Sequence, residues 1–135
     1  MQITSPQTEL PAGNPYQSLI LGPNGVAEFQ DKGPVTFQNG DYGLIATDTN
    51  TIIGINPEGG DATVIIPTQA AQGWQPNVNI GIFQSGTGTL TIAPGAGVTL
   101  LIRAGLSGEL EGQYSMAQIK AIETDVWLLF GDLAT

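Results

Sequence analysis

The 135-residue sequence contains no cysteine and no histidine. The absence of cysteine excludes a disulfide framework and thiolate chemistry. The absence of histidine removes the commonest general base, the Ser-His-Asp triad and most sets of zinc ligands. Carboxylates remain the main groups for acid–base catalysis. The composition therefore predicts a protein that is not an enzyme, with no catalytic, cofactor-binding or metal-binding residues.

Basic residues are scarce, because Lys32, Arg103 and Lys120 stand against twelve Asp and Glu residues, for a net charge of -9. Such a chain cannot neutralise a row of phosphates, and its field repels nucleic acid and anionic membranes. No apolar run approaches the roughly 18 residues of a membrane helix. The opening MQITSPQTEL lacks the basic and apolar regions of a signal peptide. We expect synthesis in the cytoplasm and neither nucleic acid nor membrane as a partner.

Apolar residues are plentiful enough for one core, since 41% of the chain is hydrophobic. Only 11% of the residues are charged, against about a quarter in an average domain. The surface must then be rich in uncharged polar residues. This balance is common in secreted and virion proteins, whose surfaces meet other proteins or sugars.

Short apolar runs recur along the chain with Gly, Pro, Asn and Asp between them, which is typical of strands joined by turns. Val78, Ile80 and Ile82 alternate with polar or small residues, as in a strand with one buried face. Residues 67–75 contain the one plausible helical turn. The pattern predicts a single all-β domain over residues 17–135, an antiparallel β-sandwich or barrel-like fold with short turns.

Residues 1–16 carry three prolines and few residues that could fill a core, so we expect an extended N-terminal arm. The arm is either a frayed terminus or a strap that orders against a neighbouring subunit or partner. The candidate partner-binding residues of this arm are Ile3, Pro6, Leu10, Pro11, Pro15 and Tyr16.

The stretch SGTGTLTIAPGAGVTLLI, residues 85–102, contains glycine pairs that resemble phosphate-binding loops. A dinucleotide site needs GxGxxG between a strand and a helix. Gly86 and Gly88 are followed by Thr91, the second pair is followed by Leu100, and the residues after both pairs read as strands. The glycines are therefore interpreted as turn residues.

Carboxylates offer the remaining route to chemistry. Glu109 and Glu111, two positions apart, would share one face of a strand, but their flanks favour exposed, solvated side chains. The sequence DTNTIIG, residues 48–54, opens like a calcium loop, yet Ile53 stands where the loop needs glycine. The enzyme hypothesis is a glycan depolymerase, which would use two carboxylates about 5 to 10 Å apart. Its candidates are Glu58, Asp61, Glu109 and Glu111.

The two tryptophans lie in different contexts. Trp127, inside DVWLLF, is expected to fill the core. Trp74 lies in a polar loop beside glycine and proline, so it is the candidate exposed interface aromatic, an interface anchor or a sugar platform. Tyr16 and Tyr42 are expected to be partly exposed as well. Packing in the core or within a loop is the alternative for each of them.

The C-terminal part resembles a module of bacteriophage virion proteins. The shared pattern is a turn-separated strand pair, a Gln-Tyr-Ser segment, a basic residue and a Trp-containing strand that ends in Gly-Asp-Leu. Here these are Gly88 to Leu100, Gln113 to Ser115, Lys120, Trp127, and Gly131 to Leu133, and the resemblance covers about residues 40–133. Glu123 departs from the pattern, which has glycine before Thr-Asp. The shared residues form turns and core, so they indicate architecture better than activity.

The resemblance implies a non-enzymatic tail-fibre, head-fibre or capsid-decoration component. A chain of this length is short for a tail fibre, so we expect a capsid decoration (cement) protein that binds the outer capsid surface of the virion and stabilises the head. Its expected partners are the major capsid protein or another virion protein, and further copies of itself in a homotrimer. The alternative is a tail-fibre tip or a receptor- or carbohydrate-binding adaptor.

Overall fold

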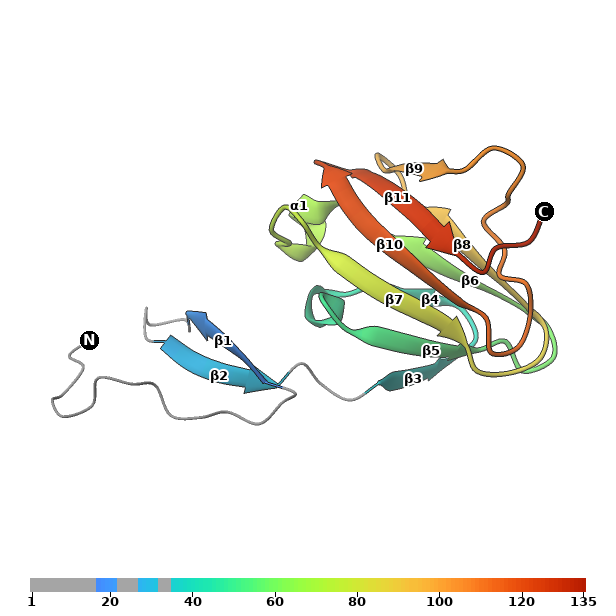
Figure 1. Cartoon of the computed structure of the whole chain (residues 1–135), viewed down its shortest axis with the longest axis horizontal. Coiled ribbons are helices and arrows are strands. Elements are labelled where there is room, and N and C mark those ends of the chain that lie inside the picture. Colours follow the sequence, from blue (N-terminus) through green and yellow to red (C-terminus); the bar gives the residue numbers. More distant parts are fainter. Residues whose placement is uncertain (1–16, 22–26, 32–34) are drawn as a thin grey trace, which may run out of the picture. The chain divides into compact units, whose positions relative to one another are not determined.

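The computed structural model describes residues 17–21, 27–31 and 35–135, and the chain divides into two compact units, Met1–Gly33 and Pro34–Thr135 (Figure 1). In the first unit, β1 (Gln17–Leu21) pairs antiparallel with β2 (Ala27–Asp31). The expected single domain spans residues 17–135, and within the described residues this hairpin is grouped with the first of the two units.

The regular elements of the second unit are almost all strands, which confirms the all-β prediction. A short helix, α1 (Gln69–Gln72), lies within the predicted helical turn, and a 3-10 helix, η1 (Ala46–Asp48), precedes β5. No helix in the described ranges is long and apolar enough to cross a membrane. The strands are β3 (Thr36–Asn39), β4 (Tyr42–Gly43), β5 (Ile52–Asn56), β6 (Asp61–Ile66), β7 (Asn79–Gln84), β8 (Thr89–Pro94), β9 (Thr99–Ile102), β10 (Met116–Glu123) and β11 (Val126–Gly131).

The strands form a six-stranded sheet, in the order β3-β5-β7-β10-β11-β9, and a three-stranded sheet, β4-β6-β8. The expected antiparallel arrangement is wrong for most of this unit. All pairs are parallel except β7 with β10 and β10 with β11. The reason is that successive strands of the chain alternate between the two sheets. The six-stranded sheet contains β3, β5 and β7, and the three-stranded sheet contains β4, β6 and β8, so neighbours within one sheet run in the same direction.

The core lies between the two sheets, and Figure 1 looks onto the six-stranded sheet with the three-stranded one behind it. Alternate residues of the strands point inward, such as Ile53 and Ile55 in β5 and Val64 and Ile66 in β6, all fully buried. Trp127 is also fully buried, as the sequence predicts. The sequence predicts alternating burial along β7. The burial of Val78, just before this strand, and of Ile80 and Ile82 within it confirms that prediction.

The glycine pairs lie in turns, and strands follow them as predicted. The turn of residues 85–88 joins β7 to β8, and that of residues 95–98 joins β8 to β9. The side chain of Gln84, which is fully buried, donates from Nε2 to the carbonyls of Gly86 at 2.9 Å and Gly88 at 2.7 Å. This side chain fixes the first turn from inside the unit.

Candidate interaction surface

The outer face of the six-stranded sheet, which points away from the core, is largely apolar. The strand register places its side chains in three rows that cross neighbouring strands. These rows are named the outer face below. They are Phe37–Gly54–Phe83–Met116, Ile52–Gly81–Gln118–Phe130 and Asn79–Lys120–Leu128–Leu101.

Two glycines let large side chains lie across the strands of the outer face. A Cβ atom at Gly54 would lie 2.7 Å from a ring carbon of Phe83 and 2.8 Å from one of Phe37. These two rings meet edge to face, with centroids 5.8 Å apart. A Cβ atom at Gly81 would lie 2.8 Å from Cε of Met116. The apolar side chains therefore form a continuous layer over the backbone of the glycines.

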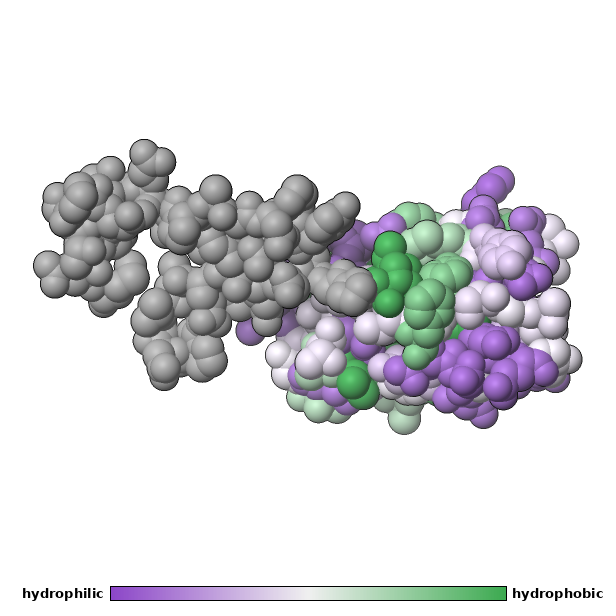
Figure 2. All heavy atoms as spheres, turned by 90° about the horizontal axis from the view of Figure 1, so that it is seen from below, coloured by the Kyte–Doolittle hydropathy of each residue, from purple (hydrophilic) through white to green (hydrophobic). Residues whose placement is uncertain are grey.

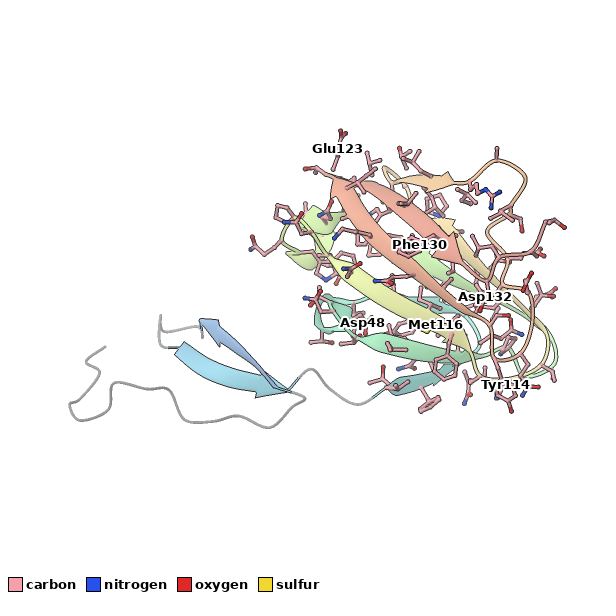
Figure 3. All side chains as sticks on the ribbon, in the orientation of Figure 1. Asp48, Tyr114, Met116, Glu123, Phe130 and Asp132 are labelled. Carbon is pink, nitrogen blue, oxygen red and sulfur yellow. The ribbon has the colours of Figure 1, made fainter. Side chains whose placement is uncertain are left out.

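Much of this layer is open to solvent. Phe37 is 65% exposed and Phe130 is 43% exposed. Lys120 is the one charged residue in the three rows, whereas Glu123 and Asp132 lie near opposite ends of the β10–β11 hairpin (Figure 3). From the side of β3 and β5, Figure 2 shows hydrophobic residues gathered next to one another on the second unit, apart from a hydrophilic region.

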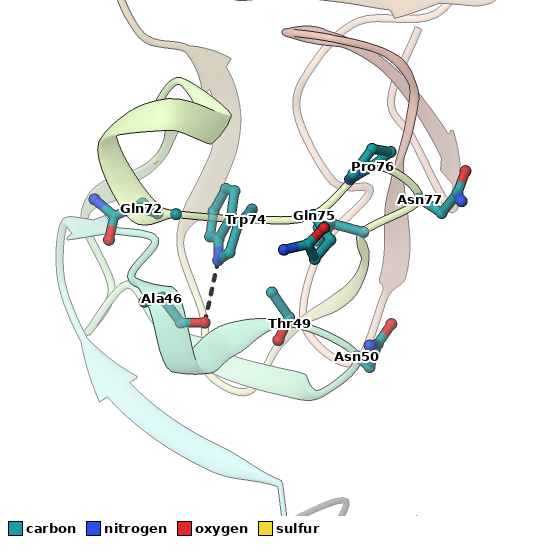
Figure 4. A pocket seen from close by; sticks show the side chains of 10 residues that line it. Ala46, Thr49, Asn50, Gln72, Trp74, Gln75, Pro76 and Asn77 are labelled. Atoms are coloured by element: carbon teal, nitrogen blue, oxygen red, sulfur yellow. Dashed lines mark hydrogen bonds between the residues drawn. The ribbon is translucent and has the colours of Figure 1, made fainter. Parts of the chain in front are cut away.

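A pocket lies between η1 and the loop that follows α1 (Figure 4). This pocket has a volume of about 250 Å³. Its polar lining consists of hydroxyl and amide side chains, and no titratable residue lines it; these side chains are those of Thr49, Asn50, Gln72, Gln75 and Asn77. Such groups can bind a neutral polar ligand by hydrogen bonds, but they supply no acid or base.

Trp74 also lines this pocket, and the expectation that it is an exposed interface aromatic is wrong. It is only 8% exposed, its indole N–H donates to the carbonyl of Ala46 at 3.1 Å, and its ring meets Trp127 edge to face at 5.7 Å between centroids. The polar loop around Trp74 hides a side chain that belongs to the core. The alternative expectation, packing, is confirmed.

Asp48 lies in η1, next to the residues that line the pocket. Its buried carboxylate accepts hydrogen bonds from the hydroxyl of Tyr42 and from the backbone N–H of Ile45, both at 2.8 Å. Burial raises the pKa of Tyr42 to about 12, and the hydrogen bond and charge of Asp48 act in the same direction. The Asp48 side chain therefore holds η1, a wall of the pocket, in place.

The carboxylates of the enzyme hypothesis do not gather at the pocket. Glu58, Asp61, Glu109 and Glu111 are all exposed, and none of them lines it. Glu109 and Glu111 flank the buried Leu110, which forms a bridge with Leu133. Their exposure agrees with the solvated side chains that the sequence favours.

The candidate partner-binding residues of the arm, Ile3 to Tyr16, lie outside the described residues. The outer face was not anticipated from the sequence, although one signal was present. In DVWLLF, Trp127 and Leu129 point into the core, so Leu128 and Phe130 must point outward. Consecutive apolar residues in a strand indicate that both of its faces are apolar.

In comparisons with known proteins, the chain matches no family model and no curated protein. The resemblance to virion modules therefore stays a prediction.

Proposed function

We propose that the chain is a non-enzymatic structural protein of a bacteriophage particle, a capsid decoration (cement) protein that binds the outer capsid surface and stabilises the head. The observation that carries this proposal is the outer face, where Phe37, Leu128 and Phe130 are exposed on one face of the six-stranded sheet in a chain with few charges. Contiguous exposed apolar surface marks sites where proteins bind proteins. Binding of this kind requires no reacting groups.

Further support comes from the virion-like pattern of residues 40–133. The proposed partner is the major capsid protein or another virion protein, and the proposed location is the outside of the virion after synthesis in the host cytoplasm. We propose a homotrimer of sandwich-like units, because symmetric assembly covers the free edges of strands such as β3 and capsids offer local threefold symmetry.

The N-terminal arm gives the first test. Deleting residues 1–15 removes the apolar residues Ile3 and Leu10 together with three prolines that stiffen the chain. We expect the 34–135 unit to stay folded, while affinity for phage particles falls by at least about 10-fold, since each buried apolar anchor contributes about 1.5–3 kcal/mol. Cosedimentation with particles measures the affinity, and the temperature at which particles release DNA measures their stabilisation.

A full-length variant with Ile3→Ser and Leu10→Ser is the matched control, because it keeps the length and the prolines of the arm. If the two apolar side chains anchor the arm, this variant should lose most of the affinity for particles that the deletion loses. Unchanged particle binding and unchanged particle stability after the deletion would contradict the strap. The folded unit would then be the docking surface.

The alternative function, a tail-fibre tip or a receptor- or carbohydrate-binding adaptor, is favoured by the amide-lined pocket. In that case a neutral glycan should bind, and Gln75→Ala should weaken binding about 10-fold by removing a hydrogen-bonding amide. Gln113→Ala, an exposed amide outside the pocket, is the control. A glycan array measures both, and no binding by the unaltered protein would set this alternative aside.

A further inference from the structure

The outer face needs an occupant, because most of its side chains are apolar, whereas polar side chains normally cover the solvent side of a sheet. In the row Phe37–Gly54–Phe83–Met116 every member is apolar or glycine. On the three-stranded sheet, by contrast, Asp61 and Thr63 occupy outward positions of β6 beside Ile65. The two sheets therefore differ in what their outer surfaces can bind.

We propose that the outer face is covered by further copies of this same chain and forms the subunit interface of its oligomer. The proposal deepens the function proposed above and rests on it. Two identical faces that meet pair two copies about a twofold axis, so a threefold assembly and the contact with the capsid use other surfaces, such as the N-terminal arm. Within the described residues, β3 pairs on one side alone and ends the sheet. Its free edge adjoins the exposed ring of Phe37, so assembly through this face would protect both.

Charge favours an identical chain as the occupant. Residues 35–135 carry Lys120 and Arg103 as their only basic residues, whereas Asp and Glu are many. Two copies that approached through carboxylate-bearing surfaces would repel each other. The three rows contain no carboxylate, so the outer face is a surface on which two strongly acidic chains can meet. Nucleic acid or an anionic membrane would require a cluster of basic residues, whereas the three rows contain Lys120 alone.

The size of the face sets the expected strength. Six strands about 4.8 Å apart, with about five residues each at about 3.3 Å, give a face of roughly 24 by 17 Å. Two such faces together bury roughly 800 Å², which is below the about 1,000 Å² of a stable specific interface and is typical of a weak, transient one. We therefore expect an oligomer that dissociates in the micromolar range and gains from contacts at the neighbouring edge.

The chain provides a closely matched pair of variants. Ile52 in β5 and Ile65 in β6 are both isoleucines in strands, and each is 38% exposed. Ile52 lies in the outer face beside Gly81, whereas Ile65 lies on the outside of the other sheet. Both are changed to glutamate, which adds the same charge to the same kind of site.

The mass of the oligomer is measured by light scattering and sedimentation of the full chain over a range of micromolar concentrations. We expect the unaltered protein and Ile65→Glu to form the same oligomer, while Ile52→Glu raises the dissociation constant at least about 100-fold, because a buried unpaired carboxylate is strongly unfavourable. Far-UV circular dichroism checks the fold. Phe130→Ser, at the other side of the sheet, should weaken assembly without adding charge and serves if Ile52→Glu fails to fold.

A monomeric unaltered protein throughout this range would overturn the proposal, as would equal masses for Ile52→Glu, Phe130→Ser and Ile65→Glu. In the first case a different protein would cover the outer face. The decoration function is judged separately by particle binding, so its failure and the failure of the subunit interface are distinguishable.

Discussion

Replacing Trp127 by alanine is expected to lower the free energy of unfolding by about 3–5 kcal/mol. The side chain is fully buried in β11 and packs edge to face on Trp74. Its neighbours across the ladders are Ala121 in β10 and Leu100 in β9. Because alanine at 121 is too small to fill the space, a cavity would remain. Domains are stable by about 5–15 kcal/mol, so this loss is a large share of the total. The midpoint of urea unfolding, followed by circular dichroism, should therefore move to a much lower urea concentration.

Trp127→Phe is the control that separates the effect of lost side-chain volume on stability from the effect of losing the indole N–H group. The indole Nε1 of Trp127 is buried and has no hydrogen-bond partner within the described structure. Phenylalanine therefore removes a polar atom without leaving another one unpaired. We expect a loss of about 1–2 kcal/mol, well below that of alanine. A loss of less than about 1 kcal/mol for Trp127→Ala would contradict a rigid core around this residue.

Strands and turns were predictable because both depend on neighbouring residues. The alternation of Val78, Ile80 and Ile82 predicts a strand, and glycines such as Gly86 predict the turn that follows. Pairing between strands depends on distant residues. Nothing in the pattern of β6 indicates that it lies between β4 and β8, parallel to both. The sequence therefore predicted an all-β chain but not the direction of its ladders.

The candidate site was predictable to a smaller degree for the same reason. Trp74 lies among polar loop residues, and its burial comes from contact with Trp127, far along the chain. The outer face likewise arises only when register brings together side chains from six strands, such as Ile52, Met116 and Phe130. Each of them alone looks like an ordinary strand residue. Contiguous surface is a property of the sheet and not of any one strand.

Gly88→Ala is expected to be nearly as disruptive as the loss of Trp127. Gly88 has φ +113°, and a Cβ atom there would lie 2.3 Å from the carbonyl oxygen of Gly60 and 3.0 Å from its nitrogen. The turns of residues 57–60 and 85–88 are stacked, since Gly59 N–H donates to Thr87 and Thr89 N–H donates to Gly60, at 2.9 and 2.8 Å. Backbone cannot move aside as a side chain can, so these turns must separate.

We expect Gly88→Ala to cost about 3 kcal/mol or more in the free energy of unfolding, from the strained φ together with the clash. Gly105→Ala is the matched control, because Gly105 also has a positive φ, +88°, but nothing lies within 4 Å of the added Cβ. It should cost only the backbone strain, about 1–2 kcal/mol. Urea unfolding of the two variants gives the difference, which measures the stacking of the turns. Equal losses would mean that the turns tolerate separation, and that backbone strain alone requires glycine at position 88.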